Sequence, residues 1–302
     1  MKKKIIYSVC SVALAGALLF LQPVQSFAVS LLSVFRVGDT KTIQITMGDI
    51  EEIYNYVGEF EHNISEDEKQ QLFSMIGEKA ATESIVVPIS SMDEFTGTQF
   101  SLPEELKDEE PQLYMVDAIT ENIPVEAVKI NGMLEEQGSD LRLDEKYDGE
   151  TLTVTTPPVL MAQYENVKLT ATQRPYLSSD AQLNSAVYDL FVQMPQIPEN
   201  LRTQLADIDI NGSDIYLPVI MGLGREVSVG QTTGYIYAAS DLGTFLQALP
   251  TEMTGGQEIS EDEELQSTNA ATLIWTKDNV VFMLSGDMSE DELIKIARSI
   301  QV

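Results

Sequence analysis

Apolar and polar positions alternate along much of the chain, and this period of two predicts β-strands. The earliest instance follows an apolar run at residues 31–37. Gly38 and Asp39 then supply turn chemistry, and Ile43 and Ile45 alternate with polar neighbours. This part of the sequence therefore predicts a β-hairpin.

The second half of the chain is richer still in strand patterns. Pro157 and Pro158 interrupt a long stretch of β-branched and aromatic residues that alternate with polar ones. Asp278 and Asn279 suit a tight turn, so the strands beside them form a second predicted hairpin. Strands are predicted at residues 113–119, 151–156, 159–172, 215–221, 226–229, 235–238, 272–276 and 280–284.

Apolar residues three or four positions apart predict helices between these strands. Asp49 is predicted to cap a helix that Gly58 ends, with Ile50, Ile53, Tyr54 and Val57 on its buried face. Ser65 and Glu68 form a capping box for a second helix, whose buried residues are Leu72, Met75 and Ile76.

Further helices follow the same signals. Pro124 is predicted to start a short helix that Gly138 ends, and Pro198 to start another, with Leu201 and Leu205 buried. Between them, an amphipathic helix carries Leu183, Val187, Leu190 and Phe191, and a terminal helix capped by Ser289 and Glu292 carries Leu293, Ile296, Ala297 and Ile300. Strands on short loops, with helices interspersed, predict an α+β fold built on an antiparallel sheet.

Composition supports a folded protein. The 302 residues are 43% hydrophobic and 22% charged, which suits one large domain or two tightly joined ones. Two acidic stretches, at residues 102–112 and 251–268, are predicted to be exposed loops. Trp275 is the single tryptophan and lies in an alternating strand, so it is predicted to pack in the core.

The first 28 residues have the pattern of a targeting segment. Three lysines at positions 2–4 precede an uncharged apolar run at residues 5–21, and Pro23 then breaks it. Small residues around Phe27 suit cleavage after Ala28; the alternative is an uncleaved anchor with its lysines inside. Cys10 lies within the apolar run and lacks the context of a lipid-modified cysteine. We therefore expect segment 1–28 to direct an extracytoplasmic domain, residues 29–302, out of the cytoplasm, either secreted or anchored.

The net charge of the chain limits the classes of partner that it can bind. Its formal net charge is −30, and residues 29–302 keep 15 basic against 48 acidic residues, a net charge of −33. Such a surface repels nucleic acid and anionic lipid headgroups, so we expect no nucleic-acid partner and no membrane contact beyond the N-terminal segment. Residues 29–302 contain no cysteine, and this composition is common in exported proteins of Gram-positive bacteria.

The two ends of this domain resemble a known family. The residues that carry the resemblance are the LLSVFRV run at 31–37 and the C-terminal unit, namely Leu273-Ile274-Trp275, the turn, residues 281–286 with the sequence VFMLSG, and the helix at 289–300. The chain resembles, over residues 30–302, the ectodomains classed as domain of unknown function 4367, found on Firmicute anti-sigma factors and related single-pass proteins. The resemblance implies an extracytoplasmic domain with a curved antiparallel sheet packed against helices, similar in shape to lipoprotein carriers. Family members that regulate sigma factors carry a cytoplasmic domain before the membrane segment, whereas only Met1 to Lys4 precede it here, so we do not expect direct sigma-factor binding.

Candidate chemistry is sparse. His62 is the only histidine, and without a second histidine or a mature cysteine the common nucleophilic triads and catalytic zinc sites are disfavoured. Asp207, Asp209, Asn211 and Asp214 match the opening of a calcium loop, but Pro218 stands where its bidentate glutamate belongs, so we expect an Asn-Gly turn there and no calcium. Gly222 and Gly224 lie between strands rather than before a helix, which does not suit a phosphate-binding loop.

We therefore assign no catalytic, cofactor-binding or metal-binding residue and expect no enzyme. The sequence favours a sensing or interaction module of the cell envelope that binds a protein, peptide or envelope ligand. The alternative is a carrier-like module that holds a lipid or other amphiphile in an apolar groove.

Overall fold

The computed structural model describes residues 41–53, 86–136, 138–194, 197–211, 216–238, 240–241 and 270–302. Several predicted features lie outside these residues: the targeting segment 1–28, the strand at 31–37, His62, the helix at 65–76 and the acidic stretch 251–268.

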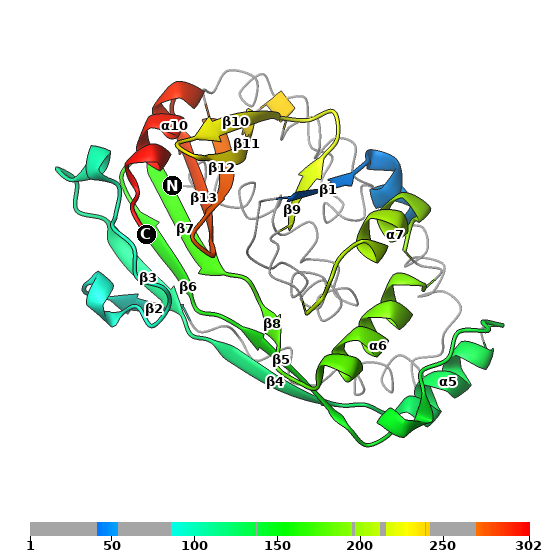
Figure 1. Cartoon of the computed structure of the whole chain (residues 1–302). Coiled ribbons are helices and arrows are strands. Elements are labelled where there is room, and N and C mark those ends of the chain that lie inside the picture. The colour runs from blue at the N-terminus through cyan, green and yellow to red at the C-terminus, as the bar shows by residue number, and fades with distance from the viewer. Residues whose placement is uncertain are drawn as a thin grey trace, which may run out of the picture.

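An eight-stranded sheet forms the main body of the described structure (Figure 1). Every neighbouring pair in it is antiparallel, as predicted, and the order is β10-β11-β12-β13-β7-β6-β3-β2. The strands are β2 (Val86–Ile89), β3 (Gln112–Val116), β6 (Val159–Gln163), β7 (Val167–Gln173), β10 (Arg225–Val229), β11 (Thr232–Ala238), β12 (Ala270–Lys277) and β13 (Val280–Asp287).

The predicted C-terminal hairpin is confirmed as β12 and β13. Asp278 and Asn279 join these strands with φ values of 46° and 72°. Positive φ at both central residues gives the turn the twist that antiparallel strands need, and Asn and Asp tolerate it better than other non-glycine residues.

One face of the eight-stranded sheet, which we call the outer face, packs against helix α10 (Glu290–Ser299). The predicted capping box is present, since Ser289 and Glu292 bond reciprocally, and the predicted apolar stripe of α10 is buried. Trp275 is fully buried in this core, as predicted, and its ring stacks on Phe282 with centroids 5.1 Å apart. We name this the outer core.

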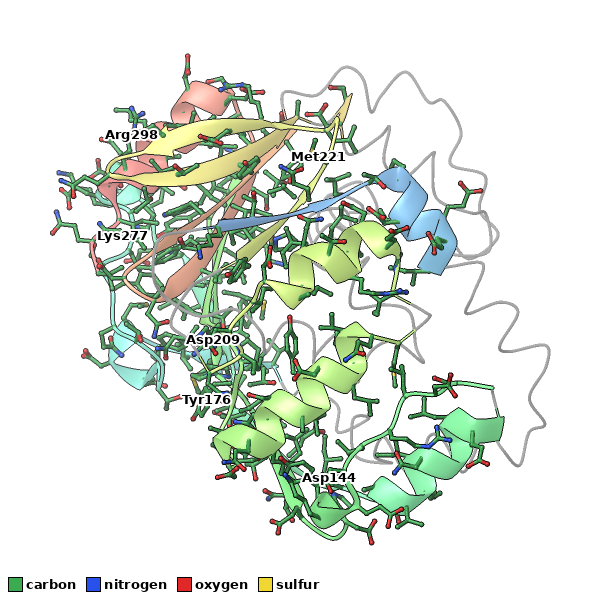
Figure 2. All side chains as sticks on the ribbon, turned by 45° about the vertical axis from the view of Figure 1, so that its right-hand side comes forward. Asp144, Tyr176, Asp209, Met221, Lys277 and Arg298 are labelled. Carbon is green, nitrogen blue, oxygen red and sulfur yellow. The ribbon has the colours of Figure 1, made fainter. Side chains whose placement is uncertain are left out.

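Two cations fasten α10 to the sheet (Figure 2). Lys277 Nζ donates to the Ile300 carbonyl at 2.8 Å, and Arg298 donates to the Ser228 carbonyl at the same distance. The 3₁₀ turns η1 (Met92–Glu94) and η2 (Glu104–Leu106) precede β3. Leu106 of η2 reaches the outer core, so residues 102–112 are not wholly the solvated loop that was predicted.

Three neighbouring strands break at the same level and continue as a second sheet, which contains β4 (Ile119–Pro124), β5 (Thr151–Thr156) and β8 (Tyr176–Leu177). The breaks are at residues 117–118, 157–158 and 174–175, and two of them contain proline. The single strand predicted at 113–119 is therefore wrong: β3 ends at Val116 and β4 begins at Ile119. Proline cannot donate to a strand ladder, which explains why the pairing stops at this level.

The break at Pro157 and Pro158 also exchanges the faces of the strand. Leu160 of β6 packs in the outer core, whereas Val154 of β5, six residues earlier, packs against helix α6 (Ala181–Val192). Residues an even number apart share one face of a regular strand, so the two-residue break turns the chain over. The same helix therefore lies against both sheets.

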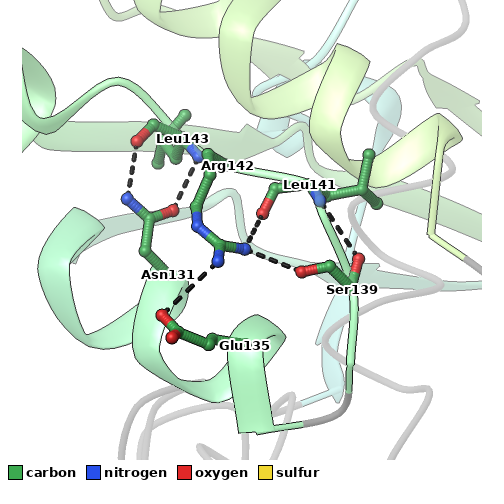
Figure 3. Close-up of polar contacts among 6 residues, drawn as sticks. All are labelled: Asn131, Glu135, Ser139, Leu141, Arg142 and Leu143. Carbon is green, nitrogen blue, oxygen red and sulfur yellow. Dashed lines mark hydrogen bonds and ion pairs between the residues drawn. The ribbon is translucent and has the colours of Figure 1, made fainter.

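Helix α5 (Ala127–Glu136) closes the far end of the second sheet. Asn131 binds the loop after α5 through both amide groups: Nδ2 donates to the Leu143 carbonyl at 2.8 Å, and Oδ1 accepts from the Leu143 amide at 2.7 Å (Figure 3). Gly138, with φ of 72°, lies at the predicted helix end, but the predicted start is wrong because Pro124 ends β4 and α5 begins at Ala127. The 3₁₀ turn η3 (Glu145–Tyr147) then leads into β5.

Strands β1 (Lys41–Ile45) and β9 (Tyr216–Ile220) form a parallel pair beside helix α7 (Glu199–Ala206). Parallel pairing of β1 with a strand so distant in the sequence was not predicted. The side-chain amide of Gln204 donates to the Gln44 carbonyl at 2.9 Å and accepts from the Gln44 amide at 2.8 Å, as a neighbouring strand would. The Gln204 side chain thereby covers part of the open edge of β1.

The helix that begins at residue 47 has a different cap from the predicted one. Thr46 Oγ1 accepts from the Asp49 amide at 3.1 Å, while Asp49 Oδ2 accepts from the Thr46 amide at 2.7 Å. Thr46 is therefore the N-cap, and Asp49 is the reciprocal partner of a capping box. Among the helices of the described residues, none has the length and apolar character needed to cross a bilayer.

Phe282 offers a direct test of the outer core. Its ring is fully buried between Trp275 and Phe100, each with its centroid 5.1 Å away. We expect Phe282→Ala to lower the free energy of unfolding by about 3–5 kcal/mol, because the lost contacts leave a cavity. Urea unfolding followed by the fluorescence of Trp275 measures this. Val128→Ala, at a position 57% exposed, is the control and should stay within about 0.5 kcal/mol of the wild type; equal effects of the two substitutions would contradict the described packing.

Candidate functional site

The residues that match the opening of a calcium-binding loop follow the end of α7, where Asp209 and Asn211 form a turn that packs against α6. Asn211 Nδ2 donates to Ser185 Oγ at 2.9 Å and to the Ala181 carbonyl at 3.2 Å. Asp209 accepts from the Asn211 amide at 3.0 Å, and this turn is marked by Asp209 in Figure 2. Asp214 lies outside the described residues. The contacts of Asn211 support the interpretation of this segment as a structural turn.

Gly222 and Gly224 connect β9 to β10, between strands as predicted. Both have positive φ, 83° and 65°. A Cβ atom on Gly224 would lie 2.6 Å from the Ile236 carbonyl oxygen and from Cδ1 of Tyr237, so close packing alone requires glycine there. Arg225, the cation beside this turn, forms an ion pair with Glu290 of α10. Over the described ranges, no three His, Cys, Asp or Glu side chains gather closely enough to hold a metal ion.

The second face of the eight-stranded sheet, which we call the inner face, carries a row of six residues that crosses six strands, and all but Thr170 are apolar or aromatic. Strand pairing places each member of this row directly opposite the next one on the neighbouring strand. All six side chains are half-buried. The row runs through Tyr114, Met161, Thr170, Met283, Ile274 and Tyr235. In Figure 1 the sheet curves around the side on which β1, β9, α6 and α7 lie, and this is the inner side.

Only part of the inner face belongs to a core of described residues. Ile274 and Val281 pack with residues of α6, α7, β1 and β9. By contrast, Val159, Met161 and Met283 belong to none of the hydrophobic clusters that the described residues form. We call the inner-face positions Val116, Val159, Met161 and Met283 the apolar patch. None of these four side chains belongs to the cores that the described residues form.

Lys168 lies on the inner face, one register row away from Met161 and Met283. In the pairing of β6, β7 and β13 it stands between Gln163 and Ser285. Its side chain is half-buried, and burial lowers the pKa of its ammonium group. In the part of the chain that the structure describes, no carboxylate lies within the 4.0 Å of an ion pair with Lys168.

The sequence indicates this surface through strands that are apolar on both faces, a pattern that the prediction of strands did not consider. In β6, Leu160 and Ala162 face the outer core, yet Val159 and Met161 on the other face are apolar too. Strand β13 repeats this arrangement, because Leu284 faces the outer core and Met283 lies on the inner face. A strand that is apolar on both faces needs contacts on both, which distinguishes it from a strand with one solvated face.

The comparison with known proteins concerns the C-terminal part of the chain. Residues 225–300, from β10 to α10, match the model of the family described as "Domain of unknown function (DUF4367)". The resemblance drawn from residues 273–300 is thereby confirmed, although the match covers less than the expected span of residues 30–302. The chain has no significant match to a curated protein or to a solved structure.

Tyr237 gives a pH-dependent test of the packing on the inner face. It pairs with Thr272 and is 1% exposed, and burial raises the pKa of its hydroxyl to about 12, against about 10 in an unfolded chain. Below pH 10 the Tyr237 hydroxyl keeps its proton in both the folded and the unfolded chain, so the folded protein has its full stability. As the pH rises from 10 to 12 the free energy of unfolding falls, because the hydroxyl ionises only in the unfolded chain. We expect Tyr237→Phe to remove about 2 kcal/mol of this alkaline loss between pH 8 and pH 11.5. Urea unfolding of both proteins at pH 8, 10 and 11.5 measures it, and parallel pH profiles would show that Tyr237 is not buried as described.

Proposed function

We propose that this chain is a non-enzymatic sensing or interaction module of the bacterial cell envelope, and that it binds its ligand or partner on the inner face of the eight-stranded sheet. The observation that carries this proposal is the apolar patch. Val159, Met161 and Met283 lie on central strands, where sheets normally cover apolar side chains, yet they stand outside the cores of the described residues. Apolar surface of this kind is typical of binding sites.

The sequence supports the remaining parts of the proposal. The targeting pattern of residues 1–28 favours export, with the domain either released or held at the outer face of the membrane. One histidine and one cysteine, the latter inside the targeting segment, favour binding over the common nucleophilic and zinc-dependent chemistries. The match of residues 225–300 to the DUF4367 model agrees with the family resemblance on which the envelope proposal draws.

A carrier-like module is the second candidate, and the shape of the sheet favours it. The main sheet curves around the side on which α6 and α7 lie (Figure 1), and a curved sheet with helices on its concave side is suited to enclosing an apolar ligand. Methionine side chains adapt their shape to irregular apolar ligands, and two of the four residues of the apolar patch, Met161 and Met283, are methionines. A carrier and a sensor would use the same face and differ in the ligand and in its rate of exchange.

Site-specific photo-crosslinking tests the location of the binding surface. A benzoylphenylalanine at position 161 places the reactive group on the inner face; at position 128 of α5, which is 57% exposed, it provides a matched apolar control. Both variants are produced with their own N-terminus in a Gram-positive host and irradiated in intact cells. We expect an adduct of discrete mass at position 161 and none of that mass at position 128.

The mass of the adduct separates the two candidates. An addition of several kilodaltons or more indicates a protein partner, as an interaction module requires, whereas an addition of a few hundred daltons indicates a small ligand. Identical spectra from positions 161 and 128 would contradict the proposal that the inner face is the binding surface.

A further inference from the structure

We propose that the inner face binds a single-chain amphiphile with one negative charge, a fatty acid, whose carboxylate pairs with Lys168 and whose chain lies across the apolar patch. This inference rests on the proposed function and names the ligand class for the same surface. Its basis is the position of Lys168 between the uncharged Gln163 and Ser285, one register row away from Met161 and Met283.

Strand pairing sets the geometry of this site. Lys168 stands opposite Gln163 on one side and Ser285 on the other, while Thr170, two residues along β7, stands between Met161 and Met283. Diagonal positions on one face of a sheet lie about 7–8 Å apart, which a long side chain or the head of a ligand spans. The row from Tyr114 to Met283 crosses four strands, or ~14 Å at the usual strand spacing. An extended acyl chain fits a strip of this size.

The state of Lys168 favours an anion there. Lys168 is half-buried and has no carboxylate partner among the described residues, so its ammonium group loses hydration without compensation there, and burial lowers its pKa. A bound carboxylate supplies the missing counter-charge and accepts charge-assisted hydrogen bonds. Gln163 and Ser285 provide neutral hydrogen-bonding groups on either side.

The charge count selects a monoanion. Lys168 is the one cation at these inner-face positions, and the exposed carboxylate of Asp287 lies on the same face two residues beyond Ser285. A carboxylate is neutralised by one ammonium group, whereas a phosphate dianion leaves a second charge beside Asp287. The rest of the chain is strongly acidic, with 48 acidic and 18 basic residues. The head group of a neutral or cationic amphiphile gains no electrostatic attraction from the ammonium group of Lys168.

Fluorescence titration with cis-parinaric acid tests the assignment, with its methyl ester and monododecyl phosphate as the competing chemistries. The chain is used as purified from a host that exports it, at pH 7 and below the micelle concentration of each probe. We expect Lys168→Gln to weaken the binding of the acid by about tenfold or more, because charge-assisted hydrogen bonds contribute about 1.5–3 kcal/mol. Binding of the methyl ester should not change.

Two further variants control for folding and for general charge effects. Lys168→Arg keeps the positive charge and should retain most of the affinity for the acid. Lys295→Gln removes an exposed lysine that pairs with Glu105 and should leave binding unchanged. Equal affinities for the acid and the ester, a stronger preference for the phosphate, or an unaltered Lys168→Gln protein would each overturn the inference.

Met161→Ser distinguishes failure of this inference from failure of the proposed function. If Met161→Ser weakens the acid and the ester alike while Lys168→Gln changes neither, the inner face binds apolar ligands but Lys168 does not select an anion. If Met161→Ser has no effect and position 161 yields no specific photo-adduct, the proposed binding surface is itself wrong.

Discussion

Side chains alternate between the two faces of a β-strand, and in β6 and β13 of the eight-stranded sheet both faces carry apolar side chains. Leu160, Phe282 and Leu284 are fully buried in the outer core under α10. Their neighbours on the inner face therefore need contacts of their own. The units β1, β9, α6 and α7 contact Ile274 and Val281, while Met161 and Met283 stand outside that core. The proposed binding surface follows from this unequal cover.

The aligned breaks in three strands determine how far that cover reaches. At Pro157 and Pro158 the chain turns over, so that β5 presents Val154 to α6 while β6 presents Leu160 to the opposite side. Helix α6 can thus pack on the second sheet through Leu183 and Leu190 and on the β1–β9 unit through Tyr188 and Val192. Among the described residues, the cores that α6 joins include Val281 of β13 but not Val159, Met161 or Met283.

Local signals in the sequence predicted much of the fold. The capping box at Ser289, the turn at Asp278 and Asn279, and the helices α6 and α7 depend on residues close together in the chain, and all are confirmed. The parallel pairing of β1 with β9 was missed, because its partners lie about 175 residues apart and no local pattern specifies the match. The candidate site was missed for the same reason. Tyr114, Lys168 and Met283 come from three separate segments, and only strand pairing places them on one face.

Methionine methyl NMR tests directly that the inner face is a ligand-binding surface. Protein labelled with ¹³C at the methionine methyl groups, with signals assigned by single Met→Leu substitutions, is titrated with decanoate below its micelle concentration. We expect the methyl signals of Met161 and Met283 to shift progressively, and that of Met115, which is buried in the outer core, to stay in place. Shifts at Met115 equal to those at Met161, or no shift at Met161 and Met283, would contradict the account.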